Sequence, residues 1–138
     1  MKVSEYLQAG NEAMAQRIIA SRNERALWKP LDHNYARIPE IYKIYCDLYP
    51  KPKKPEENAI HRRVFVVIIT RIYDPRALFG NKLDGKTREQ LAKVFGCSRS
   101  NISHLFRHVA WQAQNVRSFR EKVDECFEEM EKVLSLRT

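Results

Sequence analysis

Cysteine is scarce in this sequence, and its spacing excludes the sites that cysteines usually build. The 138 residues include only three, Cys46, Cys97 and Cys126, which lie far apart and form no Cys-x-x-Cys pair. An odd number of widely spaced cysteines encodes neither a disulfide framework nor a zinc knuckle. We therefore expect reduced thiols in the core and no bound metal.

Long apolar runs are absent as well. No stretch approaches the roughly 20 uncharged apolar residues that a transmembrane helix requires. The N-terminus carries charges and Gly10 where a signal peptide would carry an apolar run. The sequence thus predicts a cytoplasmic protein with no membrane partner.

Motifs that are typical of enzymes and cofactor sites are also missing. The sequence has no Gly-rich phosphate loop, no nucleophile spaced from a base, and no paired carboxylates in an apolar setting. His104 and His108 are one helical turn apart and Cys97 is near, but no further ligand accompanies them at zinc spacing. His33 and His61 are isolated, and we interpret them as structural. We expect no catalytic activity and no cofactor.

Positive charge is in excess and is unevenly distributed. The chain has 25 Lys and Arg against 17 Asp and Glu, a net charge of +8. Residues 1–50 contribute a net +1 (7 against 6), residues 51–120 a net +10 (15 against 5), and residues 121–138 a net −3 (3 against 6). A localised excess of this kind predicts a polyanionic partner, although charged runs also occur on solvated faces that bind nothing.

The spacing of apolar residues predicts an all-α protein. Hydrophobic residues make up 43% of the chain and aromatic residues 10%, as in globular proteins. Spacings of three and four predict an amphipathic helix within Val3–Trp28, which Gly10 interrupts. Residues 29–37 have the composition of a loop, and Pro39 then suits the first turn of a second helix.

A proline-rich segment divides the sequence. The run Pro50-Lys51-Pro52-Lys53-Lys54-Pro55 cannot hold a regular helix, because each proline lacks an amide donor and restricts the residue before it. We predict an extended basic linker at 50–57, between an N-terminal helical region at 1–49 and a domain at 58–138.

The first element of that domain is ambiguous by composition. The apolar run within Ala59–Tyr73 could be a buried strand, but its length and spacing favour a buried helix, and no partner strand is near. We therefore predict a helix there. Pro75 begins a short turn or helical piece through Phe79, and a loop follows it.

The segment Thr87–Arg107 has the pattern of a helix-turn-helix. Thr87 followed by Gln90 forms a capping box, which predicts the start of the first helix. Gly96 lies just past the end of that helix, where a left-handed conformation is needed. Ser98 is the predicted N-cap of the second helix. One side of the second helix is expected to pack inward through Ile102, Leu105, Phe106 and Val109.

The opposite side of the second helix carries short or hydrogen-bonding residues and no acidic group. Such a face fits the major groove of DNA, where Arg binds guanine in a bidentate manner and Ser and His make single contacts. We predict base-reading roles for Arg99, Ser100, Ser103, His104 and Arg107. We predict phosphate contacts for a second set, namely Lys82, Lys86, Thr87, Arg88 and Asn101.

The same residues resemble the helix-turn-helix of bacterial and phage regulators. The shared features are the small residue Ala92, the turn glycine Gly96, and buried aliphatics at Leu91, Ile102 and Leu105. A wider, partial similarity over Ala59–Leu136 is to the Trp repressor and to the C-terminal DNA-binding domain of the replication initiator DnaA. The initiator's Asp-His-Thr-Thr signature is replaced by Arg99-Ser100-Asn101-Ile102, so origin recognition does not carry over. The resemblance implies a helical bundle that binds double-stranded DNA.

The last predicted helix, at about Gln114–Ser135, has one apolar and one acidic side. Its apolar residues recur as in a heptad seam, namely Val116, Phe119, Val123, Cys126, Met130 and Val133, widened by Phe127 and Leu134. This side either packs on the core of the same chain or forms a homodimer contact, and the N-terminal helices are a second candidate for dimerisation. Trp111 falls on the groove side if the second helix of the motif continues that far, but we expect the helix to have ended and the indole to pack in the core.

These patterns predict sequence-dependent binding of double-stranded DNA, most simply by a transcriptional regulator of a bacterium or mobile element. Two alternatives remain open. The same motif would serve a phage-type DNA-packaging or assembly adaptor whose N-terminal helices recruit a larger partner. A helical protein-interaction module with no nucleic-acid role would also explain the amphipathic helices.

Overall fold

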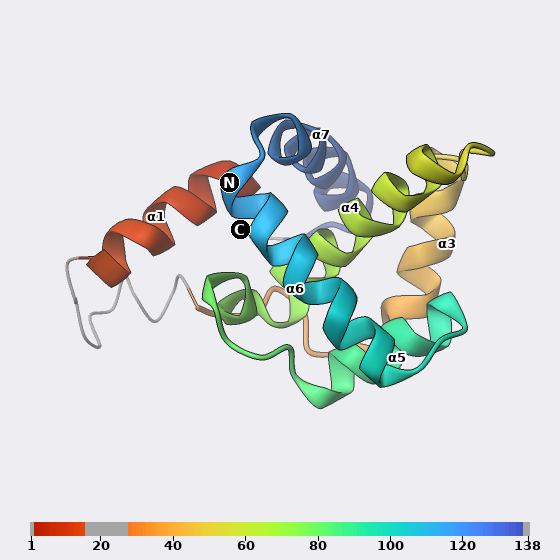
Figure 1. The fold of residues 1–138 in the computed structure, drawn as a ribbon, viewed down its shortest axis with the longest axis horizontal. Coiled ribbons are helices and arrows are strands. Elements are labelled where there is room, and N and C mark those ends of the chain that lie inside the picture. The colour runs from red at the N-terminus through yellow and green to blue at the C-terminus, as the bar shows by residue number, and fades with distance from the viewer. Residues whose placement is uncertain (1, 16–27, 137–138) are drawn as a thin grey trace.

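The computed structural model describes residues 2–15 and 28–136 and shows an all-α bundle (Figure 1). No β-strand is present in this part of the chain. The α-helices of the described residues are α1 (Val3–Ala15), α3 (Ile38–Leu48), α4 (Pro55–Tyr73), α5 (Gly85–Phe95), α6 (Arg99–Asn115) and α7 (Arg117–Val133), together with the 3-10 helices η1 (Tyr35–Arg37) and η2 (Pro75–Phe79). The predicted all-α fold class is confirmed. Among the described residues, no helix combines the length and apolar composition needed to cross a bilayer.

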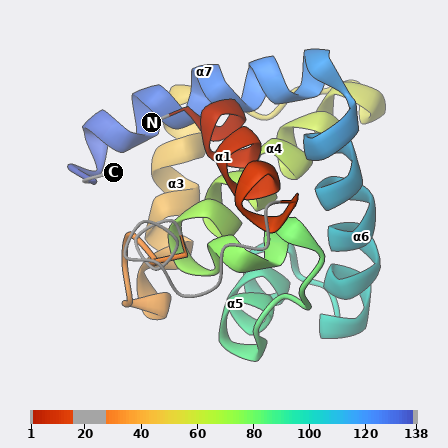
Figure 2. The same ribbon diagram turned by 90° about the vertical axis from the view of Figure 1, so that its left-hand side faces the viewer.

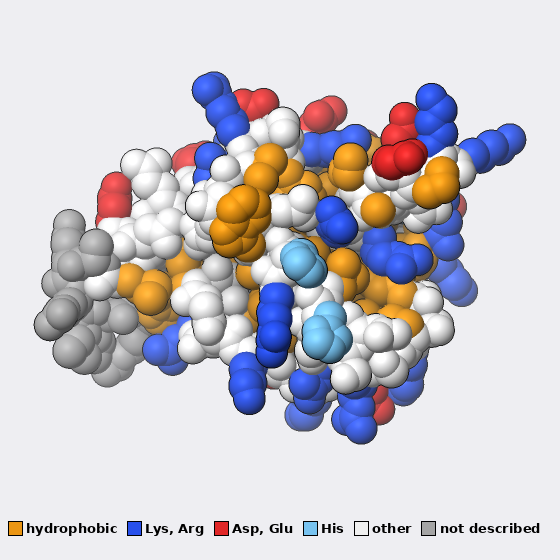
Figure 3. Space-filling model, viewed as in Figure 1, with side chains coloured by type: hydrophobic (Ala, Val, Ile, Leu, Met, Phe, Trp, Pro, Cys, Tyr) orange, Lys and Arg blue, Asp and Glu red, His pale blue; other side chains and the backbone are white. Residues whose placement is uncertain are grey.

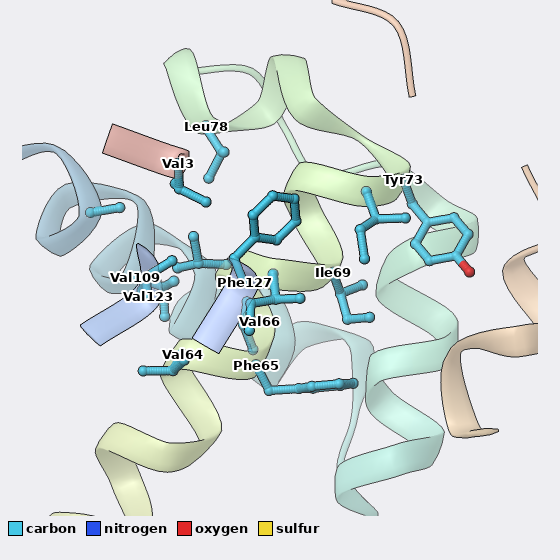
Figure 4. Packing of buried hydrophobic residues seen from close by; sticks show 14 of the residues in the cluster. Val3, Val64, Phe65, Val66, Ile69, Tyr73, Leu78, Val109, Val123 and Phe127 are labelled. Atoms are coloured by element: carbon cyan, nitrogen blue, oxygen red, sulfur yellow. The ribbon is translucent and has the colours of Figure 1, made fainter. Parts of the chain in front are cut away.

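Helix α4 lies at the centre of the bundle. Its ten successive residues Val64–Tyr73 are all buried, and the helix contacts α3, α5, α6 and α7. Figure 4 shows Phe127 of α7 among side chains of α4, α1 and η2, including Val66, Val3 and Leu78. A helix enclosed on every side needs no polar face, which is why its composition also suited a strand. The prediction of a helix is confirmed.

The connection between α3 and α4 is shorter than predicted. Pro39 lies in the first turn of α3, as expected. The segment predicted to be extended through residue 57 is already helical at Pro55, because a proline at the first helical position sacrifices no intrahelical hydrogen bond. Residues on both sides of this connection belong to one buried cluster. The division into regions 1–49 and 58–138 stays a prediction.

Buried polar contacts join the two helices beside this connection. The Tyr45 hydroxyl donates to the His61 carbonyl oxygen (2.7 Å), and His61 Nε2 lies 2.6 Å from the Tyr49 carbonyl oxygen. Burial lowers the pKa of the His61 imidazole, and Nε2 is the donor in this contact because a carbonyl oxygen can only accept. The structural interpretation of His61 agrees with this geometry.

Helix α1 lies across the bundle, as Figure 2 shows, and contacts α7 and η2. Val3, Tyr6 and Leu7 are fully buried or nearly so. The predicted N-terminal helix extended to Trp28, but residues 16–27, including Ile18 and Ile19, lie outside the described residues. Gly10 does not interrupt α1. Its lack of a side chain is instead required by packing, because a Cβ atom there would overlap the ring of Phe79.

Replacing Gly10 with Ala should lower the free energy of unfolding by about 1 kcal/mol. Alanine gains about 1 kcal/mol of helix propensity over glycine, but overpacking a core costs about 1–3 kcal/mol. The Phe79 ring has little room to yield, since it packs edge-on against Tyr6 and Trp28 at centroid distances of 5.4 and 5.0 Å. Urea denaturation monitored by circular dichroism measures the difference.

Gly85→Ala is the matched control. Gly85 is the exposed first residue of α5, and a Cβ atom there would meet only Arg88 Nη2 at 4.0 Å. This variant should be as stable as the wild-type protein or slightly more stable. Equal stabilisation by both substitutions would show that Phe79 does not restrict Gly10.

Helix α7 buries its seam within the same chain. Phe119, Val123, Cys126, Phe127 and Met130 are buried, chiefly where α7 crosses α1, α4 and α6. Val133, which the apolar spacing places in the seam, is 50% exposed. The helix is also shorter than predicted, because α6 extends to Asn115 and the extended residue Val116 separates the two helices. The burial of these α7 side chains against α1, α4 and α6 agrees with packing on the core of the same chain. Homodimerisation stays a prediction.

Candidate nucleic-acid interface

Helix α5 begins three residues earlier than its sequence pattern indicated. The N-cap is Asp84, whose Oδ1 accepts a hydrogen bond from the Thr87 backbone N–H (2.8 Å). The Thr87 hydroxyl donates to Asp84 Oδ2 (3.1 Å). The prediction of a capping box from Thr87 to Gln90 was therefore wrong. The helix starts three residues earlier because Asp84 is the N-cap and accepts a hydrogen bond from a free backbone amide of the first turn.

The turn between α5 and α6 has the predicted caps. Gly96 adopts φ 63° and ψ 39°, in the left-handed region. The Cys97 N–H donates to the Ala92 carbonyl (3.0 Å) and the Gly96 N–H to the Lys93 carbonyl (3.3 Å), the two bonds of a Schellman motif. Ser98 then caps α6, since its Oγ accepts from the Asn101 N–H (3.1 Å). The two helices are thus joined through a rigid connection of three residues.

The inward side of α6 is the predicted one. Ile102, Phe106 and Val109 are buried, and Leu105 is half-buried. These side chains fix the rotation of α6 about its own axis, because turning the helix would expose them. The opposite side must therefore face solvent.

Most of the residues predicted to read bases lie on that outward side. Ser100, His104 and Arg107 are exposed at helical spacing, and Arg99 is exposed at the N-terminal end. Ser103 is half-buried, and its hydroxyl accepts from Arg88 Nη1 (3.3 Å) and donates to the Arg99 carbonyl (3.2 Å). Ser103 consequently couples α5 to α6.

The residues predicted to contact phosphate are more dispersed. Lys82, Lys86 and Asn101 are exposed, and the Lys86 ammonium lies 5.6 Å from the centre of the Tyr35 ring. Arg88 is half-buried beside α6. Thr87 is fully buried, with its hydroxyl bonded to Asp84, so we leave it out of the interface proposed below.

A groove of about 440 Å³ runs along one side of α6. Its floor is apolar, with Ala77, Leu83 and Phe106, while Lys82, Arg88 and Arg107 supply positive charge. The fold thus places cations from the loop after η2, from α5 and from α6 around one hollow.

Two arginines on the other side of α6 were not predicted as site residues. The Arg63 Nη1 donates to Gln112 Oε1 of α6 (3.4 Å). The Arg62 guanidinium lies 5.0 Å from the centre of the Phe95 ring, at the end of α5. Both belong to α4, more than 30 residues before α6 in the sequence. No sequence signal connects them to the motif, because only the packing of α4 brings them there.

Trp111 lies where we did not expect it. The structure continues α6 to Asn115, and the indole is 62% exposed instead of packing in the core. Trp111 follows Arg107 by four residues and His104 by seven, so it shares their side of the helix. His108 is exposed beside it.

Carboxylates are absent from α6 and gather elsewhere. None of the 17 residues of α6 is acidic, and no acidic side chain lies over this helix in Figure 3. The acidic residues of α7 begin at Glu121, and Figures 1 and 2 place α7 and α5 at opposite ends of α6. Ion pairs among the described residues involve Arg37, Lys93 and Arg117. Among the described residues, no ion pair therefore involves Arg62, Arg63, Arg88, Arg99 or Arg107.

Comparison with protein-family models, with curated proteins and with solved structures gives no match to this chain.

Proposed function

We propose that this protein binds double-stranded DNA with α6 in the major groove. The observation that carries the proposal is the outward side of α6, which is exposed, free of carboxylates and, apart from Trp111, polar. A solvated helix surface usually mixes both signs of charge. A helix that meets phosphates on both sides tolerates only neutral or positive groups.

The flanks of α6 match the two walls of a major groove. Lys82 and Arg88 lie on the side of the η2 loop, and Arg63 lies on the side of α4, where it bonds to Gln112. A duplex that receives α6 presents one phosphate backbone to each flank. Cations on both sides therefore fix the register of the helix while Ser100, His104 and Arg107 face the base edges.

Sequence-dependent binding follows from the residue types at the centre. Arginine distinguishes guanine through its O6 and N7 acceptors, and serine and histidine each add a single hydrogen bond. Such a reader serves most simply as a transcriptional regulator. Selection of bound sequences from a random duplex library tests this directly. A DNA-packaging adaptor would instead show no preferred sequence in this selection and would form ring-like oligomers.

Replacing Arg107 with Ala should cost about 1–3 kcal/mol on the preferred site and relax the preference at one base pair. The exposed Arg107 faces the base edges, so its loss affects recognition of one sequence position. Fluorescence anisotropy with the selected duplex and with duplexes altered at each position measures both effects.

Lys86→Ala is the matched comparison. Lys86 is the second residue of α5 and should contact only the DNA backbone. Its loss should therefore weaken binding to all sequences alike and reduce the salt slope by about one unit. Both variants should keep wild-type helicity, since both side chains are exposed. If Arg107→Ala instead weakens every sequence equally, Arg107 binds phosphate and α6 is oriented differently.

A further inference from the structure

Trp111 continues the outward side of α6 beyond the residues that we place against bases. Ser100, His104, Arg107 and Trp111 follow one another at spacings of four, three and four, which puts them on one side of the helix. Building on the proposed function, we propose that Trp111 binds the sugar-phosphate backbone at the edge of the major groove. The indole would anchor the duplex without reading its sequence.

The length of α6 separates Trp111 from the base-reading turns. With a rise of about 1.5 Å per residue, Arg107 lies about 10 Å along the axis from Ser100, and Trp111 about 16 Å. The major groove is only about 12 Å wide. A recognition helix contacts base edges with its N-terminal residues, so the fourth turn of α6 reaches the wall of the groove, where the backbone runs.

The chemistry of an indole suits that position. The indole has one hydrogen-bond donor, Nε1–H, and no acceptor. Phosphate oxygens accept hydrogen bonds from neutral side chains as well as from cations. The ring can pack on the apolar carbons of a deoxyribose while its polar edge faces the phosphate. Asn115 Nδ2 donates to the Trp111 carbonyl (2.9 Å), which bonds the end of α6 back to this turn.

The surroundings of Trp111 favour a polyanion over a protein partner. Its exposed neighbours on α6 are polar, namely Arg107, His108 and Asn115. A stable protein interface needs a contiguous apolar core instead. The first turn of α7 carries no acidic residue, and the next carboxylate, Glu121, is bonded to Arg117 at 2.9 Å. From Arg99 to Arg120 the chain therefore carries no carboxylate that would repel phosphate.

Substitution of Trp111 tests the proposal in the full-length chain. Trp111→Ala should lower the affinity for a short duplex by more than roughly tenfold, because it removes a hydrogen bond to a charged acceptor, worth about tenfold, together with the packing of the ring. The loss should be equal for all sequences, and the salt slope should stay unchanged, because an indole carries no charge. Trp111→Phe keeps the ring but not the donor, and it should lose part of the affinity.

A second readout uses intrinsic fluorescence. The chain has two tryptophans, Trp28 and Trp111. The variant Trp28→Phe keeps an aromatic ring beside Phe79 and leaves Trp111 as the only indole. Duplex binding should change the emission of this variant and should protect it from acrylamide quenching.

The outcomes separate this inference from the proposed function. If the wild-type protein binds no duplex, both fail. If it binds and Trp111→Ala binds equally well, only the role of Trp111 is overturned. A relaxed base preference would instead make Trp111 a base reader. Unchanged DNA affinity with a smaller assembly in light scattering would make it a protein contact, which also overturns the proposal.

Discussion

Raising the salt concentration from 50 to 200 mM should weaken duplex binding roughly 250- to 1,000-fold, a log–log slope of about −4 to −5. Each phosphate contact by a cation releases condensed counterions, and about four to six contacts produce this slope. Lys82, Lys86 and Arg88 are the predicted contributors, and the structure adds Arg62 and Arg63 on the other flank. Anisotropy titrations at four or five salt concentrations measure the slope.

A matched variant separates local contacts from the net charge of +8. Lys132 is an exposed lysine in the last turn of α7, far along the chain from the interface. Lys132→Ala removes the same charge as Lys82→Ala, but only the Lys82 variant should reduce the slope, by about one unit. A wild-type slope near zero would refute DNA binding, and equal effects of both substitutions would show that binding is not confined to α6.

Gly96→Val should destabilise the protein by about 2–3 kcal/mol and lower its melting temperature by roughly 5–10 °C. Gly96 has φ 63°, a region that costs any residue with a Cβ atom about 1–2 kcal/mol and a β-branched residue more. A Cβ atom there would meet nothing within 4 Å. The penalty is therefore conformational strain and not overlap.

Gly96→Asn isolates that strain. Asparagine is the residue after glycine that most readily adopts the left-handed conformation, so this variant should lose much less stability than Gly96→Val although its side chain is of similar size. Calorimetry of the three proteins gives the comparison. Equal melting temperatures for all three would mean that the turn does not hold the left-handed conformation in solution.

The α5–α6 connection could be predicted from sequence because its signals are local. A glycine at the helix end, a serine three residues before a free amide, and apolar residues at helical spacing each act within a few positions, as at Gly96, Ser98 and Ile102. The start of α5 was mistaken because Asp84 and Thr87 are both good caps. Only the structure shows that the Thr87 hydroxyl donates a hydrogen bond to Asp84 and does not cap the helix.

Other features depend on contacts between distant residues and had no such signal. Gly10 weakened the prediction of α1, yet a ring from Phe79, nearly 70 residues later, explains it. Arg62 and Arg63 look like ordinary surface charges of α4 until α5 packs beside Arg62 and α6 beside Arg63. Trp111 was assigned to the core because large aromatic residues are usually buried, although its spacing from His104 and Arg107 already placed it outward.

The enclosure of α4 determines where this sequence can change. In a helix that covers one face of a core, positions that accept polar residues recur every three or four residues. Along Val64–Tyr73 no exposed position recurs, because all ten side chains, Thr70 and Arg71 included, are buried. A survey of tolerated substitutions should therefore find a continuous intolerant stretch in α4 and a periodic pattern in α6. The exposed residues of α6 can thus vary while the helix that supports them stays constant.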